Sequence, residues 1–318
     1  MRYLSKIHLP GNLIMFRDLS TYSPEKRYAK SKIIQFYSAV RNIGNYLPTK
    51  AIQILLGCET DTWNMHDKNI DFEYVNKNYQ VAIIGGAGLM YNCFTDFWKR
   101  FANECKLEYI IWGVGGCYPD DEIYPNVPVK IIRNTFDRLR LVNVRDDLTA
   151  NFYGFNNPDI TVCPSVYFLQ EYVVPNFKSD GKIILFSNHE QLVQKEDAIK
   201  ILNIITQFRQ SVIYTNNIQS SPEMFKELLD LYSRSKLVVT TRLHGAVIAY
   251  ALGIPYIAIP RDNKLREFVR LYGNGIMVED INKLLFFLKR NEINVGNIKM
   301  KPIIDFSVKV KNELLKIL

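Results

Sequence analysis

The 318-residue sequence lacks any apolar run long enough for a membrane-spanning helix, and its N-terminus is too polar for a secretory signal peptide. Its cysteines are few, widely spaced and without a C-x-x-C pair, so neither a disulfide framework nor a zinc site is indicated. No zinc-finger, helix-turn-helix or aromatic RNA-binding signature is present. We therefore expect a cytoplasmic protein without metal, cofactor or nucleic-acid partner. Its thiols are expected to be free and buried: Cys58, Cys93, Cys105, Cys117 and Cys163.

What the sequence does contain fits a folded protein with acidic ligands. It is 47% hydrophobic and 23% charged, and it is long enough for two domains of ordinary size. The formal net charge of +8 suits phosphates, nucleotide donors, lipid-linked diphosphates or the anionic face of a membrane. Peripheral contact with the inner membrane surface is therefore among the expectations.

The stretch Lys236–Pro260 predicts a strand, a turn, a helix and a second strand. Leu237–Val239 is a β-branched apolar run without alternation, as in a strand buried on both faces of a parallel sheet. An apolar stripe at Leu243, Val247, Tyr250 and Ala251 predicts a helix, which Gly253 would end in the left-handed conformation. Tyr256–Ile259 then predicts the next parallel strand.

The turn of this unit holds an arginine and a histidine where ligands bind in open α/β sheets, beyond the carboxyl ends of the strands. Arg242 and His244 would diverge in a regular helix, so we expect a non-helical turn that lets both face one cleft. A hydroxyl of Thr240 or Thr241 is expected to cap the helix. A guanidinium, an imidazole and free N–H groups suit a small dianion. In the alternative, Arg242 caps a neighbouring carbonyl and His244 is a core histidine.

Two glycine clusters follow strands in the first half of the chain. Val81–Ile84 and the run from Tyr109 read as buried strands that lead directly into glycines, where the backbone can approach a ligand closely. Neither cluster is a G-x-G-x-x-G dinucleotide fingerprint. The glycines predicted to line a binding crevice are Gly85, Gly86, Gly88, Gly113, Gly115 and Gly116.

A further strand, Leu139–Val144, ends at Arg145 and Asp146. At a strand end these residues could bind a donor and handle a proton. The alternative is an ordinary helix N-cap at Asp146 or Asp147 with a solvated Arg145.

The first strand of the chain is expected at Ile33–Val40 and the first helix at Pro48–Leu56. Between them, Asn42, Gly44 and Asn45 provide good turn chemistry, and they are equally compatible with a binding turn.

The second half is expected to begin with a strand over Lys182–Phe186, after a linker-like stretch near Pro175. This strand delivers His189 to its carboxyl end, where the side chain could reach a ligand or simply lie in a surface loop. After Pro260, Lys264 stands at the start of the next helix and could add positive charge or be solvated.

The segment Thr241-Arg242-Leu243-His244-Gly245, followed by Ala-Leu-Gly253-Ile-Pro255, resembles the C-terminal signature of the polysaccharide pyruvyl transferase family. The glycine turns, Val144-Arg145-Asp146 and Lys264 also match that family. The resemblance implies an α/β fold of two Rossmann-like domains facing a cleft, as in GT-B glycosyltransferases. The N-terminal domain, 1–170, would bind the acceptor and the C-terminal domain, 180–318, the donor. The final helix would return to the N-terminal domain.

The resemblance also implies transfer of an enolpyruvyl unit from phosphoenolpyruvate to a sugar acceptor, free or lipid-linked, to form a pyruvate ketal. Arg242 and Arg145 would then bind the donor anions, and His244 would bind phosphate or transfer a proton. Asp146 would be a second acid–base group, while Asn42, Gly44, Thr241, His189 and Lys264 would contribute to binding. Asn45 stands where the family usually has Asp, and an amide cannot serve as a base.

Two other functions remain open from the sequence. A glycosyltransferase of similar fold would use a nucleotide sugar in place of phosphoenolpyruvate. A non-catalytic relative would bind a sugar or an anion without turnover, and Asn45 is the feature that favours it.

Overall fold

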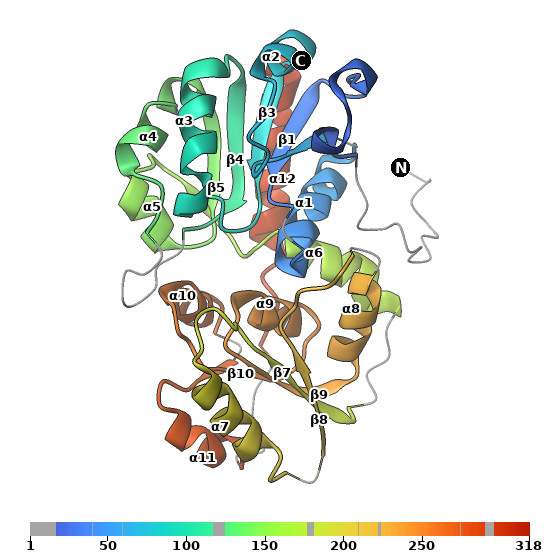
Figure 1. The fold of residues 1–318 in the computed structure, drawn as a ribbon, viewed down its shortest axis with the longest axis vertical. Helices are drawn as coiled ribbons and strands as arrows, with labels where there is room; N and C mark the ends of the chain where they lie inside the picture. The colour runs from blue at the N-terminus through green and yellow to red at the C-terminus, as the bar shows by residue number, and fades with distance from the viewer. Residues whose placement is uncertain are drawn as a thin grey trace. The chain divides into compact units, whose positions relative to one another are not determined.

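The computed structural model describes residues 17–39, 41–58, 60–116, 125–176, 181–208, 210–221, 224–273, 275–289 and 296–318. The chain forms two compact units, each built around its own sheet (Figure 1). The N-terminal unit contains the described residues of Phe16–Val40, Gly44–Pro164 and Lys299–Leu318. The C-terminal unit contains those of Arg41–Ile43 and Ser165–Ile298.

Among the described residues, the N-terminal unit has a six-stranded parallel sheet in the order β2-β1-β3-β4-β5-β6. Its strands are β1 (Ile33–Tyr37), β2 (Asp61–Asn64), β3 (Val81–Gly85), β4 (Glu108–Val114), β5 (Leu139–Val144) and β6 (Asp159–Ile160). Its helices are α1 (Ile43–Leu56), α2 (Phe72–Asn78), α3 (Thr95–Glu104), α4 (Val129–Arg133), α5 (Asp147–Tyr153) and α12 (Lys301–Ile317). The central strands β1 and β3 are buried along their whole length, which explains the unbroken apolar sequence of β3 and the mainly apolar sequence of β1, where Gln35 is the polar exception.

The C-terminal unit has a five-stranded parallel sheet in the order β11-β10-β9-β7-β8, within the described part of the chain. Its strands are β7 (Ile183–Ser187), β8 (Ser211–Thr215), β9 (Ser235–Thr240), β10 (Tyr256–Ala258) and β11 (Gly275–Met277). Its helices are α6 (Ser165–Phe168), α7 (Lys195–Ile205), α8 (Phe225–Ser233), α9 (Leu243–Ala251), α10 (Asn263–Tyr272) and α11 (Leu284–Leu288). The predicted strand–turn–helix–strand unit is therefore present as β9, α9 and β10.

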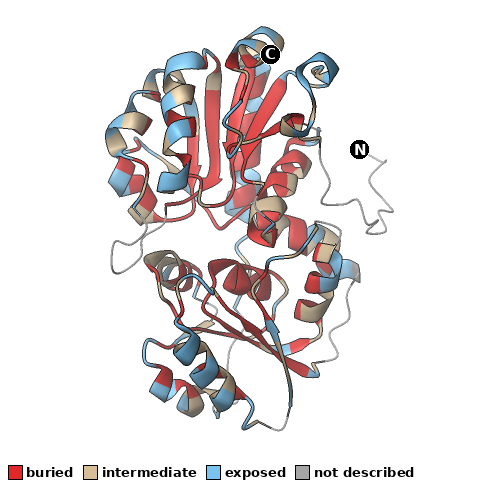
Figure 2. Cartoon of the chain, viewed as in Figure 1, coloured by how far each residue is buried: buried red, intermediate tan, exposed pale blue. Residues whose placement is uncertain are grey.

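Two features of the structure differ from the sequence expectations. All nine residues of α9 are buried, not only one stripe, and the red colour of this helix in Figure 2 matches that of the strands. The residues near the expected linker are helical, because α6 continues into a π-helical turn at Leu169–Val173. Gly253 has a φ of 67°, so the predicted left-handed stop after α9 is confirmed.

The C-terminal helix α12 belongs to the N-terminal unit. The ring of Phe306 on α12 lies 5.3 Å from that of Trp112 on β4, in an edge-on arrangement. Lys309 extends the contact to the edge of the sheet through a 2.6 Å ion pair with Asp159. The last helix of the chain thus packs against the sheet that the first half forms.

The expectation of buried thiols is correct for only part of the set. Cys105 and Cys163 are buried, whereas Cys58 and Cys93 are exposed; Cys117 lies outside the described residues. In the described part of the chain, no helix combines the length and the hydropathy needed to cross a membrane.

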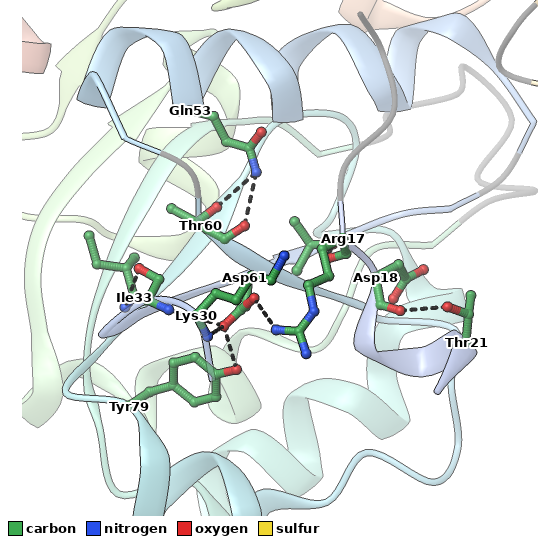
Figure 3. A network of polar contacts seen from close by, with 11 residues as sticks. Arg17, Asp18, Thr21, Lys30, Ile33, Gln53, Thr60, Asp61 and Tyr79 are labelled. Atoms are coloured by element: carbon green, nitrogen blue, oxygen red, sulfur yellow. Dashed lines mark hydrogen bonds and ion pairs between the residues drawn. The ribbon is translucent and has the colours of Figure 1, made fainter. Parts of the chain in front are cut away.

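A buried carboxylate anchors the amino edge of the first sheet (Figure 3). Asp61, at the start of β2, is 1% exposed and forms a 2.6 Å ion pair with Arg17. Its Oδ2 also accepts hydrogen bonds from the Lys30 backbone N–H at 2.7 Å and the Tyr79 hydroxyl at 3.0 Å. Burial and the neighbouring Asp61 raise the pKa of Tyr79 above its ordinary value, so the phenol remains a donor. This cluster ties the segment before β1 to β2.

We expect Asp61→Ala to lower the free energy of unfolding by about 3–5 kcal/mol, because Arg17 would lose its partner while remaining buried. Urea denaturation measures the change. The matched control is Asp96→Ala, which removes an exposed carboxylate 3.9 Å from Lys99 and should leave stability close to that of the wild type. Equal stabilities of the two variants would contradict the anchoring role of Asp61.

Candidate active site

The C-terminal sheet has a topological switch point between β7 and β9. Strand β7 leads to β8 on one side of the sheet, while β9 leads to β10 on the other, and β7 and β9 are direct neighbours. In open parallel sheets, ligands bind outside the carboxyl ends of such a strand pair. These ends are Ser187 and Thr240, so residues 188–190 and 241–244 are the candidate site residues of this unit.

Thr241 joins the two strand ends. Its backbone N–H donates to the Ser187 carbonyl at 3.0 Å, and its hydroxyl donates to Asn188 Oδ1 at 2.8 Å. The same hydroxyl accepts a 2.8 Å hydrogen bond from the backbone N–H of His189. Thr241 therefore uses its side chain to hold the loop after β7 in place.

The turn between β9 and α9 is irregular, as the spacing of Arg242 and His244 predicts. Arg242 has extended backbone angles (φ −114°, ψ 132°), and the helix begins only at Leu243. The predicted threonine cap is wrong, because α9 has no side-chain cap. Thr240 Oγ1 accepts instead from the backbone N–H of Arg242 at 2.9 Å, since the Thr240 side chain turns back over its own strand end.

Arg242 is a buried cation, only 6% exposed. Among the described residues its side chain has no ion-paired or hydrogen-bonded partner, and its Nε is fully buried. Burial lowers the pKa of the guanidinium, while the more distant Tyr232, Glu190 and Asp262 offset part of the effect. The positive end of the α9 dipole begins at the same residue. An uncompensated buried charge is costly, so this geometry favours an anionic ligand.

Two histidines belong to the candidate site residues, His189 after β7 and His244 on α9, and they differ in environment. Burial, with the charges of Arg242 and Lys264, lowers the pKa of His189 to about 2, so its ring is neutral at physiological pH. The buried Nδ1 of His189 has no hydrogen-bond partner in the described structure. His244 is the second residue of α9 and is 9% exposed.

Lys264 is the second residue of α10, and its positive charge acts on His189. Its Nζ lies 2.9 Å from Oδ2 of Asp262, a buried residue whose other carboxylate oxygen caps α10 at the Leu265 N–H. The charge of Lys264 contributes to the low pKa of His189, and its role in binding stays a prediction.

Sequence reasoning missed several polar residues of this site. Glu190 follows His189, and its carboxylate accepts hydrogen bonds from Tyr214 Oη at 2.6 Å and Asn216 Nδ2 at 3.0 Å. Tyr232 donates a 2.8 Å hydrogen bond to Asn217 Oδ1. The available signal was the polar run directly after β7 and after β8, since carboxyl ends of neighbouring parallel strands share one edge.

In the N-terminal unit, Arg145 and Asp146 follow β5 as predicted. Arg145 is 7% exposed, so the solvated alternative is wrong. Its guanidinium lies against the backbone of Gly115, where a Cβ would overlap it. Asp146 is the N-cap of α5 and accepts from the Thr149 N–H at 2.7 Å, as its structural alternative predicts. Its acid–base role stays a prediction.

Protein atoms occupy the space next to several of the predicted glycines. A Cβ at Gly85 would overlap Ile52, and one at Gly86 would overlap Pro48, both on α1. Gly113 has a φ of 66° and lies against Pro164. Because these three glycines lack a side chain, α1 and Pro164 can pack closely against their backbone. The backbones of two other predicted glycines form hydrogen bonds within the protein. The carbonyl oxygen of Gly88 accepts from the Tyr91 N–H, and the Gly116 N–H donates to Thr149 Oγ1.

The expected turn at residues 42–45 is partly helical, because α1 begins at Ile43 and not at Pro48. Gly44 and Asn45 lie in its first turn, whereas Asn42 forms an antiparallel bridge with Ile218 and belongs to the C-terminal unit. Asn45 Nδ2 donates to Ser38 Oγ at 3.2 Å. That hydroxyl is also 3.1 Å from Nε2 of His66, a histidine the sequence analysis did not select.

Gly245 fixes the approach of α9 to the strand ends, since a Cβ there would overlap the hydroxyls of Thr240 and Ser187. We expect Gly245→Ala to lower the free energy of unfolding by about 1–3 kcal/mol and, by displacing Arg242, to weaken the binding of any anion that Arg242 holds. Denaturation and calorimetric titration with inorganic phosphate test both effects. The control Ala249→Gly, on the same buried helix, should cost about 1 kcal/mol without changing phosphate affinity. Unchanged stability and affinity of Gly245→Ala would refute this role.

Known structures share this fold. A Listeria monocytogenes protein provisionally named as a UDP-N-acetylglucosamine 2-epimerase aligns with a TM-score of 0.60 and 9% identity, over 91% of this chain and 98% of that chain. The UDP-GlcNAc 2-epimerase of Methanocaldococcus jannaschii aligns with a TM-score of 0.53 and 14% identity, over 88% and 99%. That of Neisseria meningitidis gives 0.53 and 12%, over 89% and 99%. At these identities the likeness establishes the fold alone, an α/β fold of the GT-B type.

The sequence provides the assignment to a family. No curated protein matches it. The polysaccharide pyruvyl transferase family, however, matches residues 2–263, which are most of the chain and include residues 188–190 and 241–244. The protein therefore belongs to the polysaccharide pyruvyl transferase family and is a transferase.

Proposed function

We propose that this protein transfers an enolpyruvyl group from phosphoenolpyruvate to a sugar hydroxyl and closes a pyruvate ketal on a cell-surface glycan or its precursor. The observation that supports the donor most directly is the buried Arg242 without a counter-ion. Phosphoenolpyruvate has a phosphate and a carboxylate, and a guanidinium binds either one through two parallel hydrogen bonds. The family assignment supports the sugar acceptor.

The chemistry requires one acid and one base at the donor. Protonation of the methylene carbon makes C2 electrophilic, the first hydroxyl attacks, phosphate leaves, and a second hydroxyl closes the ketal. We assign Arg242 to the donor anion and His244 to phosphate binding or proton transfer, with Arg145 as a second donor contact. Lys264 adds positive charge near the phosphate, and His189 is assigned as a contact that is neutral without donor. No separate cofactor is required by this sequence of steps.

The neutral state of His189 has a role in this proposal. Its pKa of about 2 in the absence of ligand reflects burial beside two cations. A bound phosphate dianion would raise that pKa, because an opposite charge favours the imidazolium. Donor binding would thus shift the pKa of His189 upward from a value that keeps the ring neutral without donor.

A nucleotide-sugar glycosyltransferase is the second candidate. The shared fold with UDP-GlcNAc 2-epimerases favours it, and an unpaired arginine also suits a diphosphate. Incubation with each donor separates the two, since phosphate release indicates the first and nucleoside diphosphate release the second. Mass spectrometry of acceptor glycans then detects the added ketal.

We expect Arg242→Ala to lower turnover of phosphoenolpyruvate by at least about 10²-fold, because the developing phosphate charge would lose its buried partner. Phosphate release measures the rate. The control Arg270→Ala removes an exposed arginine on α10 that pairs with Glu267, and it should retain the wild-type rate. Near-normal turnover of Arg242→Ala would refute the donor role.

A further inference from the structure

Glu190 is an exposed carboxylate that two neighbours hold in one orientation. It follows the carboxyl end of β7, and both of its hydrogen-bond donors come from the end of β8. Tyr214 Oη donates to Oε1 at 2.6 Å, and Asn216 Nδ2 donates to Oε2 at 3.0 Å. An exposed glutamate ordinarily samples several rotamers, so this arrangement fixes a charge that would otherwise be mobile. Each carboxylate oxygen still has a lone pair available for a ligand.

A chain of hydrogen bonds connects Glu190 to the turn that bears Arg242. The Thr241 hydroxyl donates to Asn188 Oδ1 at 2.8 Å, and Asn188 Nδ2 donates to Tyr214 Oη at 3.4 Å. Tyr214 then donates to Glu190. The position of the carboxylate is therefore coupled to the switch point and not to the exposed loop alone.

Glu190 and Arg242 attract one another without forming an ion pair in the described structure. Two opposite charges at the same sheet edge that do not pair with one another suit a ligand with two different ends. An anionic end would lie on Arg242, and a hydroxyl-bearing end would donate to Glu190. Such a ligand matches a donor anion with the attacking sugar hydroxyl beside it.

We propose that Glu190 is the general base that accepts the proton of the attacking sugar hydroxyl. This inference rests on the proposed function. As the hydroxyl oxygen bonds to C2, its proton passes to the Glu190 carboxylate, while C3 receives a proton from the acid assigned to His244. The C2–O bond to phosphate then breaks with its electron pair, and the phosphate leaves with the proton from Glu190. Glu190 is again ionised, and the proton of the second hydroxyl restores the acid.

The surroundings of Glu190 keep it ionised before the reaction. Hydrogen bonds from Tyr214 and Asn216 hold the pKa of its carboxyl below the ordinary value, and Arg242 adds to the effect. The adjacent His189 is neutral, and burial keeps the pKa of Tyr214 above its usual range. A donor dianion on Arg242 would remove its attraction and raise the basicity of Glu190 when the base is needed.

Glu190→Gln tests the role directly, with phosphate release as the assay. We expect kcat to fall by at least about 10²-fold while the KM for phosphoenolpyruvate stays within about threefold, as for loss of a group that acts in the transition state. Calorimetric titration should show that phosphoenolpyruvate still binds. The matched control is Glu227→Gln on α8, an exposed glutamate whose removal should change neither value.

Tyr214→Phe provides a readout that a structural role would not produce. Loss of its hydrogen bond raises the pKa of Glu190, so the carboxyl is protonated at higher pH and the acidic limb of the kcat profile moves upward. A kcat of Glu190→Gln within about threefold of the wild type overturns the assignment of Glu190 as the general base and leaves the proposed function standing. The same holds for an acidic limb that does not move in Tyr214→Phe. Absence of phosphate release in the wild type overturns the proposed function and this inference together.

Discussion

The arrangement of the C-terminal unit depends on one buried positive charge. Arg242 lies at the point where β9 gives way to α9, with the positive end of the helix dipole at the same residue. In a medium of low dielectric, both features disfavour the cation unless an anion is present. The surrounding residues do not relieve this: the nearby histidine is neutral, and the nearby carboxylates lie further away than ion-pair distance in the described structure. The fold maintains a charge that a ligand would neutralise.

A second buried arginine provides the contrast. Arg17 forms an ion pair with Asp61, which also accepts two backbone N–H bonds and a tyrosine hydroxyl. That cluster satisfies its charge and serves to join chain segments in the N-terminal unit. Arg17 and Arg242 thus differ in their partners and not in burial, since both side chains are largely removed from solvent.

Sequence patterns predicted the strands and helices better than they predicted the roles of individual residues. The strands β3 and β5 and the helix α9 were located because apolar runs and stops are local properties. Gly85 and Gly86 were selected as ligand-facing, and the structure places helix α1 against them instead. The threonines before Arg242 were expected to cap α9, and they bond to strand ends and to the loop after β7. Glu190 was not selected at all, because its donors Tyr214 and Asn216 are 24 and 26 residues further along the chain.

The sequence by itself determined the two α/β halves, the strand–turn–helix unit around Arg242, and the likeness to one enzyme family. These features depend on short segments whose order and spacing are visible in one dimension. Only the tertiary structure decided that Arg242 has no counter-ion in the described chain, that His189 is neutral, and that Tyr214 and Asn216 orient Glu190. Burial and charge compensation depend on which strands lie side by side, and the order β9-β7-β8 places residues 188–190, 214–216 and 241–244 at one sheet edge.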